Sequence, residues 1–404
     1  MRRSRPVSLL LVMIAYFMVV FIKLSPSIVM PSFQNTLGLS SSTVGLISGA
    51  YFFSYAFMQL VAGPLCKRIG AVNVIGIGIV VAAFGLMIFG LGNNTFLLFS
   101  GRFLLGLGTG PIFVALLFFL QCNYDAQGYV RNYSISVFIS NTGSAFSAAP
   151  LKLILQYVSI RVLFSCLALF SFLIGILFFI FGKVDESEII ENDTSLTKQL
   201  SVCTHEIFHD SRLFGSMLIW MLVSGGILAY QGLWCAKWTS SVFSDYQQLS
   251  GLGGTLVSLG IMTASLLATR IHRICGSRER TVIISGWLQI IAMLLVTVIK
   301  IHDSKAFLLM SFVSDFFFGI LMGNVCLQIP PFISEVSKPG SNATIMGIMN
   351  FMANLFTQLV QFATGACVDR TESFSTTFFI MIIVFVAVMG SISVSMLIKK
   401  RRFG

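Results

Sequence analysis

The sequence predicts an all-α, polytopic membrane protein with twelve transmembrane helices in two pseudo-symmetric six-helix bundles. Hydrophobic residues make up 56% of the 404 residues and charged residues 10%, whereas soluble domains carry about 25% charged residues. Apolar windows of about twenty residues, the length that crosses a hydrocarbon core of about 30 Å, recur along the whole chain. One polar stretch near the middle separates these windows into two sets of six.

Each predicted segment is a long apolar run without the alternation of a β-barrel strand. Backbone groups in lipid must be satisfied within the segment, so such runs predict helices. The first run is too long, and too poorly provided with a cleavage site, to be a removed signal peptide. In chain order the segments are 7–30, 43–63, 71–91, 95–120, 132–154, 160–182, 213–236, 249–269, 281–300, 306–330, 342–366 and 374–398.

The basic residues predict the orientation. If Arg2, Arg3 and Arg5 are cytoplasmic, most of the 26 Lys and Arg residues fall on the same side of the membrane. By the positive-inside rule both termini are then cytoplasmic. We therefore attribute the net charge of +11 to this orientation signal and to attraction of the basic residues to anionic lipid headgroups. We expect no nucleic-acid partner. The eight cysteines show no ligand spacing, so we expect no disulfide, metal or cofactor.

The polar stretch in the middle of the chain predicts a cytoplasmic linker. Seven of the fifteen acidic residues lie between Asp185 and Asp210, which is too charged for lipid. We expect an amphipathic surface helix near Leu196 to Phe208. The predicted domains are an N-terminal bundle at 1–182, the linker at 183–212 and a C-terminal bundle at 213–404.

The two bundles share a sequence pattern. FLLFSGRFLLG, which ends at Gly106, and FLLMSFVSDFFFG, which ends at Gly319, both place a charge four residues before the final glycine. Arg102 and Asp315 thus occupy equivalent positions with opposite sign. A 6+6 duplication of this kind is typical of secondary transporters whose substrate site lies between the repeats.

Two motifs resemble those of the major facilitator superfamily. The loop after the second segment, GPLCKRIG, resembles the family's G-x-x-x-D-R-x-G, although Lys67 stands where the family has Asp. The fourth segment contains GRFLLGLGTG, which resembles R-x-x-x-G-x-G-x-G and begins its match at Arg102. Small residues in such motifs permit turns and close helix contact. The resemblance implies a conformational role for Gly63, Arg68, Gly70, Gly106 and Gly110.

Two further stretches narrow the resemblance. QGLWCAKW, starting at Gln231, and NATIMGIMNFMANLFTQLVQFATG, starting at Asn342, are similar to a bacterial sugar-phosphate-permease-like branch. The resemblance implies alternating access between two bundles in the inner membrane, with segments one, four, seven and ten lining the pathway. It further implies proton-coupled uptake of a small polar, anionic metabolite by a monomer. The expected partners are this substrate, protons or another coupling ion, and the lipid bilayer.

Three charges are predicted to lie deep in the membrane, on segments one, four and ten. A charge at that depth costs at least about 2.5 kcal/mol, which makes each a functional candidate. Lys23 either binds the anionic substrate or extends to the outer headgroups. Arg102 either bonds backbone carbonyls of the first helix, takes part in proton coupling or helps Lys23 to bind the substrate. Asp315 either carries the coupling proton, holds a substrate ammonium group or pairs with a buried cation.

Polar residues on apolar segments supply further substrate-binding candidates. Polar faces on membrane helices point to protein or water, so each residue either contacts substrate or packs helices together. The candidates are Tyr16, Tyr51, Tyr55, Tyr230, Gln231, Trp234, Asn350, Asn354 and Gln358.

Two other functions remain open. A drug/proton antiporter usually carries G-x-x-x-G-P-x-x-G-G on the fifth helix, and the stretch from Gly143 to Pro150 matches it poorly. A transport-inactive metabolite sensor normally has a larger cytoplasmic region than this linker of about thirty residues. The sequence shows no nucleotide-binding or catalytic motif, so we expect no enzyme.

Overall fold

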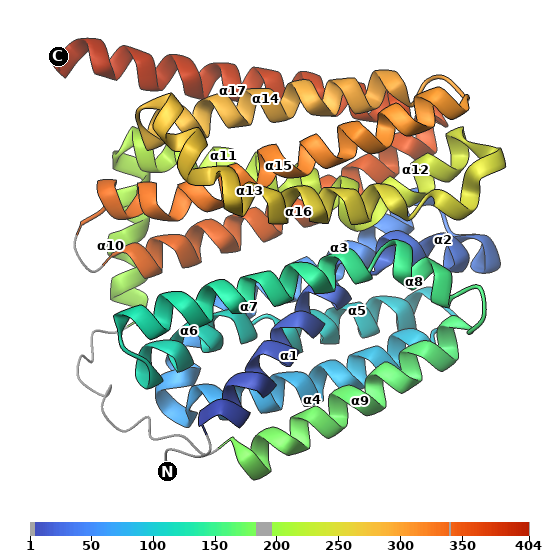
Figure 1. The fold of residues 1–404 in the computed structure, drawn as a ribbon, viewed down its shortest axis with the longest axis horizontal. Helices are drawn as coiled ribbons and strands as arrows, with labels where there is room; N and C mark the ends of the chain where they lie inside the picture. The colour runs from blue at the N-terminus through green and yellow to red at the C-terminus, as the bar shows by residue number, and fades with distance from the viewer. Residues whose placement is uncertain (1–4, 183–195, 339–340, 404) are drawn as a thin grey trace. The chain divides into compact units, whose positions relative to one another are not determined.

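The computed structural model describes residues 5–182, 196–338 and 341–403, and over these ranges the regular structure is helical without strands. The chain divides into two compact units, residues 1–194 and 195–404 (Figure 1). The predicted all-α membrane fold is thus confirmed.

In the N-terminal unit, α4 packs between α5 and α9, α3 packs on α5, and α1 packs on α7 (Figure 1). Pro26 and Pro111 follow the breaks after α1 and α5, because proline at the start of a helix needs no N–H partner. The helices are α1 (Arg5–Leu24), α2 (Pro26–Leu37), α3 (Ser41–Ile69), α4 (Ala71–Gly90), α5 (Thr95–Thr109), α6 (Ile112–Asn123), α7 (Ala126–Phe146), α8 (Ala149–Ile154) and α9 (Ile160–Phe181).

In the C-terminal unit, α15 packs against α13 and α14, α11 packs on α16, and α17 packs on α14. A π-helical turn, η1, interrupts the helix that begins at Ser211. The elements are α10 (Leu196–His209), α11 (Ser211–Ala229), η1 (Tyr230–Trp234), α12 (Cys235–Val242), η2 (Ser244–Leu249), α13 (Leu252–Cys275), α14 (Arg278–Ile299), α15 (Lys305–Val336), α16 (Asn342–Thr371) and α17 (Phe374–Phe403).

Each predicted segment is mainly helical, but the segment boundaries need correction. Within the described ranges, ten helices are long and apolar enough to span a membrane, and Leu252–Ala268 is a shorter apolar helix. The predicted segment 132–154 is absent from these ten because α7 is rich in polar residues and ends at Phe146. The predicted segment 7–30 is two helices, because the chain turns at Ser25 before Pro26.

The motif glycines differ in their roles. Gly70 ends α3 with φ of 86°, a conformation that only glycine adopts without strain. A Cβ on Gly106 would overlap the backbone oxygen of Tyr51, so this glycine lets α5 approach α3 closely. A Cβ on Gly110 would lie 2.9 Å from the backbone oxygen of Tyr55, which is one turn after Tyr51 on α3. A Cβ on Gly63 would meet no described atom within 4 Å.

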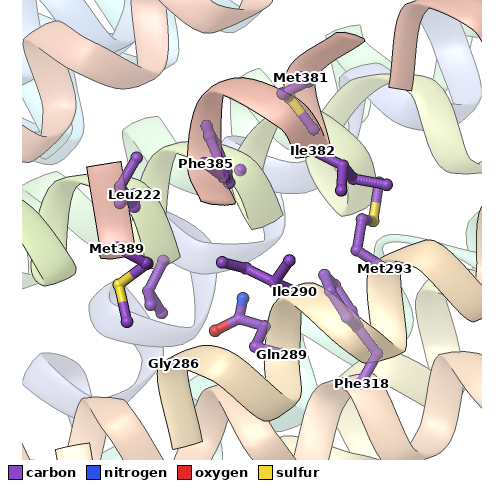
Figure 2. A pocket seen from close by; sticks show the side chains of 12 residues that line it. Leu222, Gly286, Gln289, Ile290, Met293, Phe318, Met381, Ile382, Phe385 and Met389 are labelled. Atoms are coloured by element: carbon purple, nitrogen blue, oxygen red, sulfur yellow. The ribbon is translucent and has the colours of Figure 1, made fainter. Parts of the chain in front are cut away.

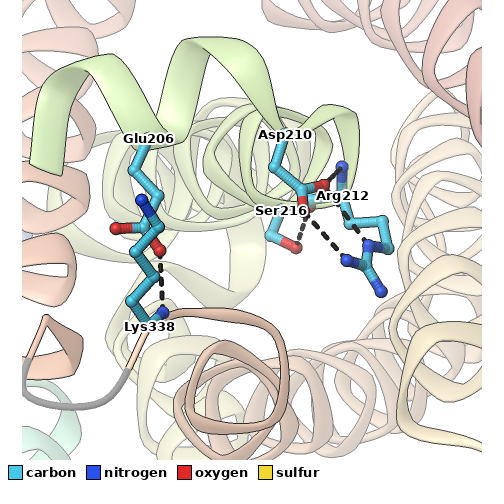
Figure 3. A network of polar contacts seen from close by, with 5 residues as sticks. All are labelled: Glu206, Asp210, Arg212, Ser216 and Lys338. Atoms are coloured by element: carbon cyan, nitrogen blue, oxygen red, sulfur yellow. Dashed lines mark hydrogen bonds and ion pairs between the residues drawn. The ribbon is translucent and has the colours of Figure 1, made fainter.

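The linker helix predicted near Leu196 to Phe208 is confirmed as α10, which packs on α11 and α16. Glu206 accepts a 2.8 Å hydrogen bond from the backbone N–H of Lys338, in the loop between α15 and α16 (Figure 3). Asp210 caps α11 by accepting a hydrogen bond from the Arg212 N–H at 2.8 Å and pairs with its guanidinium at 2.9 Å. The helix therefore belongs to the C-terminal unit; residues 183–195 of the predicted linker lie outside the described ranges.

Candidate functional site

Arg102 is buried in the N-terminal unit, where it joins three helices. Its guanidinium donates to the backbone oxygen of Ile22 on α1 at 3.2 Å and to that of Ser48 on α3 at 3.3 Å. The same group lies 4.5 Å from the ring centroid of Tyr51. Arg102 is 1% exposed, and one of the two carbonyls that hold it, that of Ile22, belongs to the peptide bond that precedes Lys23. This geometry favours the carbonyl-bonding role over direct substrate contact.

Lys23 is half-buried at the end of α1 and lies among aromatic rings. Its Nζ is 5.4 Å from the ring centroid of Phe52 and 5.2 Å from that of Tyr55. Tyr55 also stacks on Tyr51, with ring centroids 5.5 Å apart, and the Tyr51 ring lies against the guanidinium of Arg102. Four predicted candidates therefore form one group, which we call the N-terminal cation cluster: Lys23, Tyr51, Tyr55 and Arg102.

The cation cluster lies in a unit that is poor in acidic residues. Asp125 is the single acid in residues 1–182, and it caps the N-terminus of α7 through the N–H of Gly128 at 3.0 Å. Tyr16, the remaining N-terminal candidate, is half-buried, and its ring stacks on Phe113 of α6 at 5.7 Å. Residues 1–182 thus carry a strong excess of basic over acidic residues.

Asp315 on α15 is fully buried in the C-terminal unit and belongs to a chain of hydrogen bonds. Tyr230 donates its hydroxyl to Asp315 Oδ1 at 2.5 Å, and the same hydroxyl accepts from Lys300 Nζ at 2.8 Å. Lys300 also donates to Thr239 Oγ1 at 2.8 Å. We call Tyr230, Thr239, Lys300 and Asp315 the C-terminal charge cluster.

The second carboxylate oxygen of Asp315 has a different environment. Oδ2 is buried and has no hydrogen-bond partner among the described residues. A Cβ on Gly253 of α13 would lie 2.6 Å from Oδ2 and 2.9 Å from Cys235 Sγ, so a side chain there would displace the carboxylate. Gly253 therefore lets the backbone of α13 lie close to the carboxylate of Asp315.

Lys300 is a buried charge that is not among the three predicted from the sequence. The sequence places it as the last residue of segment 281–300, where a lysine normally extends to the headgroups. In the structure its side chain is 0% exposed and turns inward to Tyr230. Thr297, one turn earlier and also buried, was the available signal, because two polar residues on one face indicate an interior face.

The other C-terminal candidates contact neighbouring helices of the same unit. Gln231 donates to Ser258 Oγ on α13 at 2.9 Å, and Trp234 donates to Thr364 Oγ1 on α16 at 2.8 Å. Asn350 accepts from Trp220 at 3.0 Å. Asn354 donates to the backbone of its own helix, and Gln358 is half-buried on α16.

These features define a membrane transporter, and the comparisons identify its family. The family model of the Major Facilitator Superfamily matches residues 9–360, so the chain belongs to this superfamily and is a transporter, not an enzyme.

Two relatives and one solved structure illustrate the similarity. The Bacillus subtilis (strain 168) "Uncharacterized transporter YybO" is 23% identical over 395 residues, which are 89% of this chain and 86% of that protein. "Multidrug resistance protein 2" of the same organism is 24% identical over 240 residues, 54% of each chain. The crystal structure of the nucleoside transporter NupG superposes with a TM-score of 0.78 at 14% identity, covering 96% of this chain and 98% of that one.

Proposed function

We propose that this transporter takes up a small, polar, anionic metabolite across the bacterial inner membrane, with both termini in the cytoplasm, and couples uptake to protons. The N-terminal cation cluster binds the anionic group, and Asp315 carries the coupling proton. The resemblance of QGLWCAKW and of α16 to sugar-phosphate-permease-like carriers supports an anionic substrate.

The observation that carries the proposal is the unequal distribution of charge. Lys23 and Arg102 lie at membrane depth in a unit whose residues 1–182 contain one acid, Asp125, at a helix N-terminus. An excess of cations in a low-dielectric environment attracts anions strongly. Because backbone carbonyls already hold Arg102, Lys23 is the residue that we assign to the substrate.

The rings of the cation cluster restrict the substrate further. Tyr51 is 0% exposed and Tyr55 is 5% exposed, so neither ring offers a face on which an aromatic substrate could stack. Recognition then depends on charge and on hydrogen bonds, which suits a compact oxyanion.

The C-terminal charge cluster supports the coupling role. Asp315 is a buried carboxylate: Oδ1 accepts a hydrogen bond from Tyr230, and Oδ2 has no hydrogen-bond partner in the part of the chain that the structure describes. A buried group of this kind is stabilised by binding a proton.

The proposal is tested in two stages. Thermal stabilisation of the purified protein by sugar phosphates, carboxylates, amino acids and nucleosides identifies ligands, and labelled ligand is then followed into proteoliposomes with and without a pH gradient. We expect anions to stabilise the protein, and uptake to rise when the outside is acidic. Stabilisation by cationic or uncharged compounds alone would overturn the anion assignment.

Two variants separate the parts of the proposal. Lys23→Ala should abolish anion binding without loss of fold, whereas Lys237→Ala should not, although Lys237 is also half-buried and lies 5.8 Å from the ring of Trp234. Asp315→Asn should abolish accumulation driven by a pH gradient and spare exchange of substrate for substrate. Wild-type binding by the first variant, or full pH coupling by the second, would refute the respective role.

A drug/proton antiporter remains the second candidate, because part of the chain is similar to Multidrug resistance protein 2. That function predicts stabilisation by apolar cations and extrusion of these compounds from vesicles. The same ligand panel, extended with such compounds, distinguishes the two functions.

A further inference from the structure

A cavity lies between helices α11, α14, α15 and α17 of the C-terminal unit (Figure 2). All four helices belong to segments that are long and apolar enough to span a membrane. The empty space is about 410 Å³, a volume that includes the open side of the cavity. Pockets for small molecules usually have about 300–1,000 Å³, mostly apolar walls and a few polar groups. The cavity therefore suits a compact molecule.

The walls of the cavity can adapt to an occupant. A Cβ on Gly226 would lie 2.7 Å from the ring of Phe385, and a Cβ on Gly286 would lie 2.8 Å from Met389 Cε, so a larger residue at either glycine would press on the side chains that line the cavity. Methionine side chains are unbranched and adjust to irregular spaces. Three of them line the cavity, those of Met293, Met381 and Met389.

Gln289 is the one polar residue among the twelve that line the cavity, all of which lie in the described part of the chain. Its amide points into the cavity (Figure 2). The residue is 7% exposed, and its Oε1 is buried without a hydrogen-bond partner from the described residues. Because an unsatisfied buried acceptor is costly, this oxygen needs a donor from outside these residues.

The other buried polar side chains of α14 differ from Gln289, because each has a partner. Thr281 donates to the backbone oxygen of Ser277 at 2.7 Å, and Thr297 donates to that of Met293 at 2.8 Å. Ser285 accepts from Asn324 at 2.6 Å. The unsatisfied oxygen is therefore a feature of the cavity and not of the helix as a whole.

Water is a poor donor for this position. A buried water makes about three hydrogen bonds, and cavities lined by apolar side chains stay dry. The side chains around the cavity offer a single amide, so a water there would lack most of its partners. Apolar cavities of this kind instead take up small apolar molecules.

We propose that the cavity binds a compact apolar molecule that carries one hydroxyl or N–H donor, and that Gln289 Oε1 accepts the hydrogen bond from this donor. The apolar body of the molecule replaces empty space against the methionines, and its donor satisfies the buried oxygen. The bilayer supplies such molecules, because apolar compounds leave water for hydrocarbon. A charged metabolite does not fit this site, since nothing in its lining carries a charge.

The site touches the surroundings of the C-terminal charge cluster. Phe318 lines the cavity and packs edge-on against Tyr230, with ring centroids 5.6 Å apart. Phe378, which precedes Ile382 of the cavity wall by one turn of α17, packs against the same ring at 5.9 Å. A bound molecule therefore restrains Phe318, one of the rings that hold the hydroxyl of Tyr230 against Asp315.

The test compares indole with indene, which share two fused rings. Indole has an N–H donor where indene has a CH₂, so the difference in their affinities measures the hydrogen bond to Gln289. Labelled indole is titrated into the full-length protein in lipid nanodiscs, and empty nanodiscs report the amount that dissolves in lipid. We expect saturable binding of one indole per chain. Displacement by indene should need about tenfold more compound than displacement by unlabelled indole.

Two variants locate the binding. Gln289→Met keeps the length of the side chain and removes an unsatisfied buried amide, so the protein should fold. This variant should bind indene as before and lose about tenfold in affinity for indole, which makes the two compounds equal. Gly286→Leu places a side chain beside the flexible end of Met389 and should weaken the binding of both compounds by at least about tenfold.

The matched control is Gln361→Met on α16. Gln361 is 1% exposed and also has a buried oxygen without a partner among the described residues, but it does not line the cavity. This variant should keep the preference for indole.

Three results would overturn the inference. Absence of saturable binding above empty nanodiscs, up to about 1 mM indole, would show that the cavity takes no ligand of this class. Equal affinities for indole and indene in the unaltered protein would show that Gln289 accepts no hydrogen bond from the ligand. A preference for indole that survives in Gln289→Met, or binding that is unchanged in Gly286→Leu, would place the bound molecule elsewhere.

Discussion

The C-terminal charge cluster makes a quantitative prediction about two variants and their combination. Lys300 Nζ and Asp315 Oδ1 are each bonded to the hydroxyl of Tyr230, at 2.8 Å and 2.5 Å, so they lie at most about 5.3 Å apart. With an effective dielectric constant of about 20, Coulomb's law gives an attraction of about 3 kcal/mol. Removing either charge leaves the other buried and uncompensated, a change that costs about 3–5 kcal/mol.

We therefore expect Lys300→Met and Asp315→Asn each to lower the melting temperature of the purified protein by about 6–12 °C. The double variant removes both charges and should recover most of this loss. Intrinsic fluorescence reports the transition directly, because all four tryptophans lie in the C-terminal unit. If Asp315 has the proposed coupling role, the double variant should still lack proton-driven uptake.

Additive losses of melting temperature in the two single variants and the double variant would refute this reasoning. If the double variant melts as low as the two single losses combined predict, the two charges do not stabilise each other through Tyr230. Tyr230→Phe is the geometric control, because it removes the hydroxyl that joins them and keeps the ring that packs on Phe318. It should destabilise the protein by about 1–3 kcal/mol, as expected for a lost buried hydrogen-bond partner.

Three further predictions concern other parts of the chain. Arg102→Lys keeps the charge but cannot bond two carbonyls with one planar group, so the N-terminal unit should lose about 1–3 kcal/mol of stability in thermal melts. Gly106→Ala should be destabilising because its Cβ would overlap α3, whereas Gly63→Ala should be neutral or slightly stabilising by the same assay. Burial raises the pKa of the Cys203 thiol in α10, so less thiolate is present at a given pH. Labelling of Cys203 with a maleimide should therefore be slow at neutral pH and faster at alkaline pH. Rapid labelling at neutral pH would show that α10 detaches from the C-terminal unit.

The sequence predicts the helical architecture well because membrane helices need long apolar runs, which are visible in any window. The predicted helix boundaries are wrong where a proline or polar residues interrupt the apolar run. Pro26 splits the first predicted segment, and the polar residues of α7 weaken the fifth. Lys23, Arg102 and Asp315 were found because a charge inside an apolar run is conspicuous by itself.

Lys300 was missed for the opposite reason. It stands at the end of its run beside a polar loop, where Thr297 on the same helix face is the one local signal. Its contact with Tyr230, seventy residues earlier, is visible only in the structure. The side-chain oxygens of Gln289 and Asn324, which have no hydrogen-bond partner within the described ranges, are likewise a result of packing between helices. Pairing across helices is therefore the part of the site that required the structure.

The π-helical turn at Tyr230–Trp234 has a consequence for how this site could arise and be lost. A π-turn holds one residue more than an α-turn, so every later side chain is rotated by about 100° about the helix axis. That offset brings Thr239 round to the ammonium of Lys300. Deletion of one codon between Tyr230 and Trp234 would convert the π-turn to an α-turn and rotate Thr239 away from Lys300. The C-terminal charge cluster would then lose this contact although none of its four residues is substituted.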